Sequence, residues 1–190
     1  MIIEGRAWLF GDNLSATHFL SAKYDPLVRA GKFDELAAHV LEDSRPDFVQ
    51  RVRSGDLLFA GNAFGTGKHL EGVVGALMAL GIRAVFARTF AAGWERDSMN
   101  LGLAAVLCPG TELLREGDRV RIDLSEPFAH NLSASHRFAI VPTSASMLEM
   151  LEAGGLEAFT VKARDELLSI AAQRIKRQIK AKLAEQAAAA

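Results

Sequence analysis

Cysteine is nearly absent from this sequence of 190 residues, which contains only Cys108. One thiol cannot form a disulfide within the chain, and alone it cannot build a cysteine zinc site or an iron–sulfur cluster. Its neighbours in Ala104–Cys108 are apolar, so we expect the thiol to be buried as a small hydrophobic side chain. We predict no metal site in this chain.

Long apolar runs are missing as well. No stretch reaches membrane-spanning length, and Met1–Arg6 is too short for the basic and apolar parts of a secretion signal. The formal net charge is −1, which gives no reason to expect nucleic-acid or membrane binding. No two histidines show HxxxH or HxH spacing, so a histidine metal site has no support. We therefore expect a cytoplasmic protein.

What the sequence does contain is a glycine-rich turn, Gly61–Glu71, directly after the apolar run Asp56–Ala60. The pattern predicts a buried strand, a turn and the start of a helix. Glycines in such a turn allow positive φ and close approach to a ligand, and the helix N-terminus favours an anion. Three side chains at the mouth of the turn suit a small carboxylate or phosphate: Lys68, His69 and Glu71.

Two nucleotide-binding motifs fail at this turn. A Walker P-loop needs a glycine where Asn62 stands and a serine or threonine where His69 stands. A Rossmann fingerprint needs a third glycine where Leu70 stands. The remaining alternative is a tight structural turn that carries a solvated Lys-His pair.

Strands and helices alternate along the first part of the chain, which favours parallel pairing in an α/β fold. We predict strands at residues 5–10, 56–60, 82–87 and 104–108, a loop at 14–24, and helices at 33–42, from Pro46, at 69–80 and at 89–100. Arg88 follows the third strand, at the sheet edge where α/β proteins bind ligands.

The pattern changes after residue 110. Residues 119–124 alternate polar and apolar side chains, and residues 136–141 read as their antiparallel partner across a loop. A helix at 144–153 ends at Gly154-Gly155. The prediction is an α/β fold whose mixed sheet has flanking helices and a small antiparallel element.

The last segment, residues 163–186, has no Gly or Pro and is rich in helix formers. An apolar stripe is predicted along one face: Leu168, Ala171, Ala172, Ile175, Ile179 and Leu183. The basic opposite face is typical of a solvated helix, and a helix that docks a partner is the alternative. We expect residues 187–190 to fray.

Several motifs occur in a characteristic order: Trp8–Leu14 (WLFGDNL), Ser21–Tyr24, Gly81–Ala91, Arg96–Leu103 and Met150–Leu156. Over residues 5–158 the chain resembles the small subunit of isopropylmalate dehydratase, the swivelling β/α domain of the aconitase superfamily. The resemblance implies a swivel domain at residues 1–160 and a C-terminal helical extension at 161–190.

This resemblance also implies a function. The chain would be the small subunit of a heteromeric hydro-lyase that acts on a malate-type 2-hydroxy dicarboxylic acid, such as 3-isopropylmalate in leucine biosynthesis. This chain would hold no cofactor, and a [4Fe–4S] cluster would sit on the large partner subunit. The cluster iron would act as a Lewis acid.

The chain departs from the family at the glycine turn, which usually reads Phe-Gly-x-Gly-Ser-Ser-Arg-Glu-His. In aconitase-like enzymes the first serine is the general base and the arginine binds a substrate carboxylate. Lys68, His69 and Leu70 replace the two serines and the arginine, and Glu71 is kept. In the first loop, Ser15 and Thr17 stand where the family usually has aspartates. These losses favour an alternative: a swivel-fold binding or regulatory module that has lost catalysis.

The candidate site combines both loops. Lys68 and His69 are the candidate catalytic residues; histidine titrates near neutral pH, and lysine can do so when its pKa falls from about 10.4 towards 7–8. The candidate substrate-binding residues are Thr17, His18, Gly65, Thr66, Gly67 and Arg88. Because the two loops match the family's substrate-facing loops, we expect them to face one cleft.

Overall fold

A computed structural model describes residues 1–68 and 70–188, with side chains described as far as Gln178. These residues form one seven-stranded mixed sheet in the order β4-β3-β2-β1-β5-β6-β7. Four neighbouring strands run parallel: β1 (Ile2–Leu9), β2 (Leu57–Ala60), β3 (Ala84–Ala87) and β4 (Ala104–Leu107). Three antiparallel strands extend the sheet on the other side of β1: β5 (Arg119–Asp123), β6 (Phe128–Asn131) and β7 (His136–Ala139). The α/β fold class is confirmed.

The central parallel strands β2 and β3 are buried on both faces, as their continuous apolar sequences require. Alternate residues of β2 enter different cores, because successive side chains of a strand point to opposite faces. Leu58 and Ala60 pack into the core beneath α5, whereas Leu57 and Phe59 pack into the core shared with β5–β7. The sheet therefore holds the carboxyl ends of its parallel strands at fixed positions.

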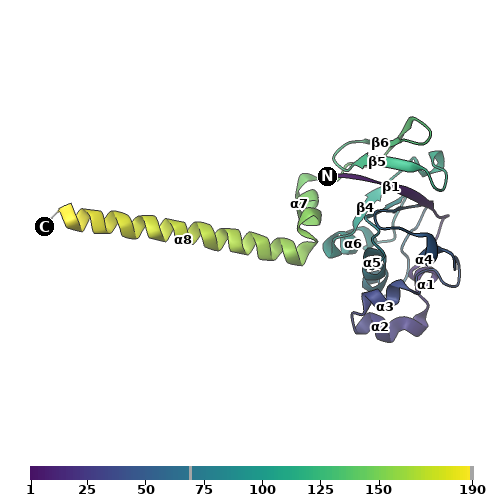
Figure 1. Cartoon of the computed structure of the whole chain (residues 1–190), viewed down its shortest axis with the longest axis horizontal. Coiled ribbons are helices and arrows are strands. Elements are labelled where there is room, and N and C mark those ends of the chain that lie inside the picture. The colour runs from purple at the N-terminus through teal and green to yellow at the C-terminus, as the bar shows by residue number, and fades with distance from the viewer. Residues whose placement is uncertain (69, 189–190) are drawn as a thin grey trace.

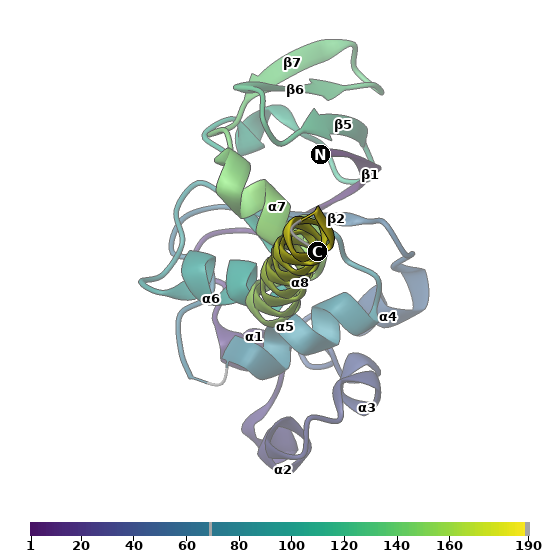
Figure 2. The same ribbon diagram turned by 90° about the vertical axis from the view of Figure 1, so that its left-hand side faces the viewer.

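The helices have these bounds: α1 (Ala16–Phe19), α2 (Asp25–Arg29), α3 (Phe33–Ala37), α4 (Phe48–Arg51), α5 (Leu70–Ala79), α6 (Trp94–Leu101), α7 (Ala145–Ala153) and α8 (Leu156–Ala188). Short 3-10 turns lie at Ala22–Tyr24 and Thr111–Leu113. Figure 2 shows β5–β7 at one end of the domain and α2 and α3 at the opposite end.

Several predicted boundaries were wrong. The helix expected at 33–42 ends at Ala37; Leu41 has φ of 60°, and its N–H bonds to the Phe19 carbonyl, which draws the chain away from a helical path. The helix expected at 89–100 begins only at Trp94, because left-handed Gly93 precedes it. The loop expected at 14–24 contains α1 and a 3-10 turn.

The antiparallel element was predicted with the wrong pairing. Strands β5 and β7 are not neighbours, because β6 lies between them and pairs with both. Residues 128–131 were placed in a loop because four residues give a weak pattern. The side chain of Asn131 is nevertheless buried, and it donates a hydrogen bond to Asp118 at 2.6 Å.

Helix α8 begins at Leu156, earlier than the predicted residue 163, and extends far from the domain (Figure 1). The sequence predicted a stripe that includes Ile179 and Leu183, and these two side chains lie outside the described ones. The frayed end expected at 187–190 lies partly outside the described residues. The division of the chain at residue 160 stays a prediction.

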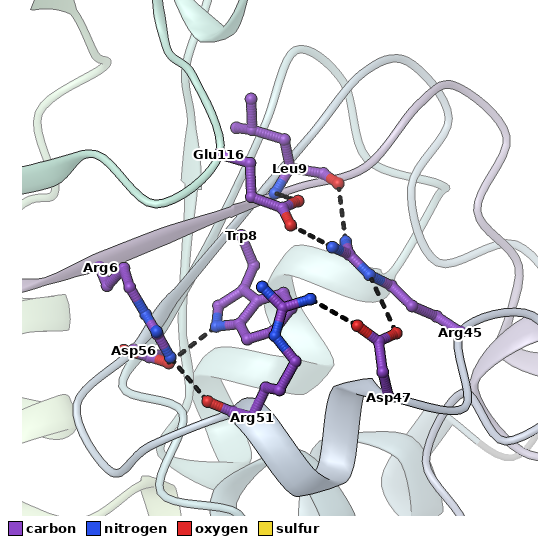
Figure 3. A network of polar contacts seen from close by, with 8 residues as sticks. All are labelled: Arg6, Trp8, Leu9, Arg45, Asp47, Arg51, Asp56 and Glu116. Carbon is purple, nitrogen blue, oxygen red and sulfur yellow. Dashed lines mark hydrogen bonds and ion pairs between the residues drawn. The ribbon is translucent and has the colours of Figure 1, made fainter.

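A buried carboxylate ties β1 to the segment before β2. The Asp56 side chain accepts hydrogen bonds from Arg6 at 2.8 Å and from Trp8 Nε1 at 2.7 Å (Figure 3). It also accepts one from the Arg53 N–H at 3.0 Å. Burial alone would raise the pKa of Asp56, but the hydrogen bonds from Arg6, Trp8 and Arg53 outweigh it and lower the pKa. The ionised form therefore stabilises the fold.

Replacing Asp56 by asparagine is expected to destabilise the fold by roughly 1.5–3 kcal/mol, because buried donors lose a charged acceptor. Asp47, in the same network but 45% exposed, is the control, and its asparagine variant is expected to lose much less stability, because solvent screens an exposed ion pair. Urea unfolding measures both. The Asp56 contribution is present above its unfolded pKa of about 3.9 and is lost as the pH falls further. Equal losses in both variants at pH 7 would contradict this account.

Candidate functional site

The loop after β1 and the glycine turn after β2 lie side by side. The Asn13 N–H bonds to the Asn62 carbonyl at 2.7 Å, and the Ala16 N–H bonds to the Thr66 carbonyl at 2.7 Å. The Gly65 N–H bonds back to the Leu14 carbonyl at 2.8 Å. Backbone hydrogen bonds thus join the two segments along their length, because parallel β1 and β2 deliver them to the same sheet edge.

A carboxylate at the base of these loops ties three strands together. Asp12 Oδ1 accepts from the Asn62 N–H at 2.7 Å and from Arg88 at 3.0 Å. The Asn62 N–H and then the Arg88 guanidinium lower the pKa of Asp12. A Cβ at Gly61 would lie 1.8 Å from the same oxygen, so only glycine leaves room for the carboxylate.

The backbone of both loops is held in conformations that L side chains rarely adopt. Asn13 and Ala63 have φ of 60° and 54°, and Gly65 and Gly67 have φ of 83° and 116°. Such residues persist only where the surrounding structure determines them, and they cluster at functional sites. The strain is independent support for a site at this position.

Helix α6 supplies the floor of the turn. The Trp94 ring is fully buried against Phe64, with ring centroids 5.0 Å apart, and a Cβ at Gly65 would lie 2.5 Å from it. The ring shares a core with Val85 and Ala87 of β3 and lies under the glycine turn. Three described side-chain atoms are buried without a hydrogen-bond partner: Trp94 Nε1 and Ser98 Oγ here, and His136 Nε2 on β7. Trp94 and Ser98 are one helical turn apart on α6.

Lys68 borders two hollows on the surface. One hollow, of about 300 Å³, lies between α1 and the turn and is lined by Thr17, Ser21, Gly67 and Lys68 among others. The other, of about 580 Å³, lies between the turn and α6 and includes Lys68, Glu71, Asp97 and Asn100. The structure therefore brings Thr17 and Lys68 to one face, as expected from the two loops.

A short hydrogen-bonded chain orients His18. Its Nδ1 accepts from the Ser15 N–H at 3.0 Å and lies 2.7 Å from Ser15 Oγ. Ser15 Oγ in turn lies 2.8 Å from Thr17 Oγ1. Because Nδ1 accepts from a backbone N–H, neutral His18 carries its proton on Nε2. The exposed ring thus presents an N–H donor to solvent or to an anion.

The remaining predicted site residues fall in different surroundings. Thr66, Gly67 and Lys68 are exposed, whereas Gly65 is buried. Arg88 lies at the end of β3, but one of its nitrogens is committed to Asp12. His69 lies outside the described residues.

The prediction from sequence missed three residues that build the site: Asp12, Asn62 and Trp94. Asp12 was noted only as part of a family motif, and its position directly after the first strand was the signal that could have found it. Nothing in the sequence indicates that the Asn62 N–H would face it.

Metal binding has no support in the described part of the chain, where no group of three or more His, Cys, Asp or Glu residues is placed to hold an ion. Cys108 is buried, donates to the Ala139 carbonyl at 3.5 Å, and burial raises its pKa to about 12. Nor does any helix of the described residues combine the length and apolar character that a membrane crossing requires.

The mixed sheet and the two joined loops define a swivel-type α/β domain. Searches of family models gave no match. The 3-isopropylmalate dehydratase small subunit of Wolinella succinogenes is 38% identical over 159 residues, covering 82% of this chain and 91% of that protein. The methanogen homoaconitase small subunit of Methanothermobacter thermautotrophicus is 37% identical over 168 residues, covering 88% and 96%.

A solved structure supports the same relationship. A crystal structure of 3-isopropylmalate dehydratase (LeuD) from Methanocaldococcus jannaschii superposes with a TM-score of 0.79 at 32% identity, covering 89% of this chain and 98% of that one. The chain belongs to the family of 3-isopropylmalate dehydratase small subunits. The aconitase-type swivel fold implied by the sequence motifs is confirmed.

Proposed function

We propose that this chain is the small subunit of a heteromeric hydro-lyase that acts on a malate-type 2-hydroxy dicarboxylic acid, such as 3-isopropylmalate or a related substituted malate. The names of its relatives support the reaction class. The observation that carries the proposal is the joined pair of loops, which places Thr17 and Lys68 on one hollow above strained backbone.

The implied [4Fe–4S] cluster does not fit this chain. A cluster is held by several thiolates, and the single thiol here is buried and hydrogen-bonded. We therefore assign the cluster to a large partner subunit in the cytoplasm. The part of this chain is to bind and orient substrate and to move a proton.

Lys68 is the proposed carboxylate contact. Its ammonium lies on an exposed turn at the start of α5, where the helix dipole also favours an anion. The family arginine is absent at Leu70, so a carboxylate held by Lys68 would sit closer to the glycine turn. The Nε2–H of His18 is a second donor for the same group.

Proton removal needs a base close to the substrate carbon. The exposed position of Lys68 in the separate chain does not supply the desolvated environment that a lysine base requires. Closure of the large subunit over the turn would supply it. His69 is the other proposed base, because imidazole accepts a proton at neutral pH without such help.

Replacing Lys68 by alanine is expected to weaken binding of a malate-type dicarboxylate by about tenfold or more in the two-subunit complex. A charge-assisted hydrogen bond contributes roughly 1.5–3 kcal/mol, and tenfold corresponds to about 1.4 kcal/mol. Lys68→Arg should retain most of the affinity. Lys32→Ala, which removes a lysine that pairs with Glu35 on an exposed turn, is the control and should bind as the unmodified protein does. Isothermal titration measures all three.

Equal affinities for Lys68→Ala and the unmodified protein would make the turn a structural element. That result would favour the alternative, a swivel-fold module that has lost catalysis. The alternative draws on a definite observation, since serine, arginine and two aspartates of the family motifs are replaced here.

A further inference from the structure

Beyond its first turns, helix α8 has no neighbouring element among the described residues. Every side chain from Arg164 to Gln178 is exposed, including apolar Leu168, Ile170 and Ile175 at 62%, 62% and 55%. Figure 1 shows the helix pointing straight away from the sheet. Helices in proteins gain most of their stability from packing an apolar face, so an isolated helix of this kind lacks its usual support.

The root of the helix is firmly attached. A Cβ at Gly155 would lie 2.6 Å from the Asn100 carbonyl oxygen, so the turn before α8 packs directly on the end of α6. Phe159 packs against the core shared with β5–β7. The exposed part therefore begins from a fixed direction.

One sector of α8 carries a row of four apolar side chains, called the stripe here, whereas exposed Leu167 and Ile170 lie on other faces. Successive helical residues are about 100° apart, which places Val161, Leu168, Ala172 and Ile175 within a sector of about 60°. Val161 also lines a shallow hollow of about 800 Å³ at the root of the helix. The stripe thus runs from the domain into solvent, with small Ala172 near the middle of the helix.

Charge is divided along the same helix. The half near the domain carries three acidic residues, Glu157, Asp165 and Glu166, and two basic ones, Lys162 and Arg164, of which Arg164 pairs with Asp165 at 2.9 Å. Arg174, Lys176 and Arg177 lie in the half beyond Ala172. Asp165 and Lys176 flank the apolar stripe on the same side, about 20° apart around the helix. A partner with the opposite order of charges would complement this face.

A second copy of the helix in antiparallel orientation has that order. In such a pair, Asp165 of each copy comes opposite Lys176 of the other, and the two stripes face each other over about residues 166–175, in the middle of the pair. The relatives are matched over 90–98% of their own length while 82–88% of this chain is matched, so 12–18% of this chain has no counterpart in these alignments.

We propose that α8 is a dimerisation helix that pairs antiparallel with α8 of a second copy of this chain. The half near the domain, with Asp165, packs against the basic half of the other copy, with Lys176, and the stripe of Val161, Leu168, Ala172 and Ile175 forms the seam. The pairing is independent of the proposed hydro-lyase activity.

Light scattering coupled to size-exclusion chromatography tests the dimer, with an expected mass of twice 20.5 kDa. Leu168→Lys should raise the dissociation constant by about a hundredfold, because the substituted position lies in the seam of both copies. Leu167→Lys is the matched control: this neighbour is 67% exposed but lies outside the stripe, and it should leave the dimer intact. A monomer for the unmodified chain at 100 µM (about 2 mg/ml), or equal effects of the two variants, would overturn the proposal.

A charge exchange tests the orientation. Asp165→Lys and Lys176→Asp should each weaken the dimer about three- to tenfold, and the double variant should restore it. In a parallel pair these positions are about 16 Å apart along the axis and would not couple. A spin label attached to Glu157→Cys measures the distance between position 157 of the two copies. That distance should be about 40 Å in an antiparallel pair and about 10 Å in a parallel pair. Absence of rescue, or the short distance, would overturn the antiparallel pairing.

Discussion

Gly65→Ala is expected to unfold the glycine turn and to abolish catalysis by the two-subunit complex. Left-handed backbone at a residue other than glycine costs about 1–3 kcal/mol, and the φ of Gly65 is 83°. The added Cβ would also lie 2.5 Å from the buried Trp94 ring, and overpacking of this kind costs a further 1–3 kcal/mol or so. Urea unfolding should therefore show a loss of roughly 2–6 kcal/mol.

Gly55→Ala separates these two costs. Gly55 has φ of 93°, but an added Cβ there has nothing within 4 Å, so only the backbone cost applies. We expect Gly55→Ala to lose about 1–3 kcal/mol and to keep its activity. A Gly65→Ala variant no less stable than Gly55→Ala would show that Trp94 does not constrain the turn.

Gly61→Ala is expected to separate the two loops and to lower substrate affinity by at least tenfold. Its Cβ would lie 1.8 Å from Asp12 Oδ1 and 3.1 Å from the Asp12 nitrogen, so the carboxylate must leave the Asn62 N–H and Arg88. A stability loss of about 1–3 kcal/mol should accompany the change. Denaturant unfolding and substrate titration measure the two effects.

Two further variants test whether the clash with the Asp12 carboxylate causes the effects of Gly61→Ala. Gly11→Ala, in the same loop, places its Cβ where nothing lies within 4 Å and should behave as the unmodified protein does. Asp12→Ala combined with Gly61→Ala removes the clashing carboxylate, so the pair should lose less than the sum of the single variants. Additive losses would mean that the Asp12 carboxylate is not what Gly61 accommodates.

The parallel part of the fold follows from the sequence because its strands are short, apolar and separated by helix patterns. Residues 56–60 and 104–108 were placed within one residue of β2 and β4. Gly81, with φ of 80°, ends the helix before β3 where a glycine is expected. Local composition determines these elements, so a single sequence suffices to predict them.

Tertiary contacts decide the elements that the sequence did not predict. Strand β6 is exposed at Phe128 and buried at Asn131, opposite to the usual preference of those residue types, and its pairing partners fix it. The early end of α3 depends on the bond from Leu41 to Phe19, which no local pattern reveals. Strand β1 begins at Ile2, three residues before the predicted start at residue 5, because residues 2–6 pair with β5.

In the candidate site, too, local sequence predicted some features and tertiary contacts decide the others. Thr17 and Lys68 could be placed together because both follow strands that end at one sheet edge. Two other contacts could not be predicted: the burial of Trp94 under Gly65, and the hydrogen bond from the Asn62 N–H to Asp12. They join residues about 30 and 50 positions apart in the sequence. The roles proposed for Lys68, His69, Thr17 and His18 stay predictions.

Turnover of the reconstituted complex tests the central claim most directly. The large subunit from the same organism, carrying its cluster, is mixed with this chain, and formation of the unsaturated dicarboxylate from 3-isopropylmalate and related substituted malates is followed by absorbance. The account predicts turnover of at least one such substrate with both subunits and none with either subunit alone. Turnover by this chain alone would contradict it. So would no turnover of any substrate under conditions in which the same large subunit is active with the small subunit of a relative.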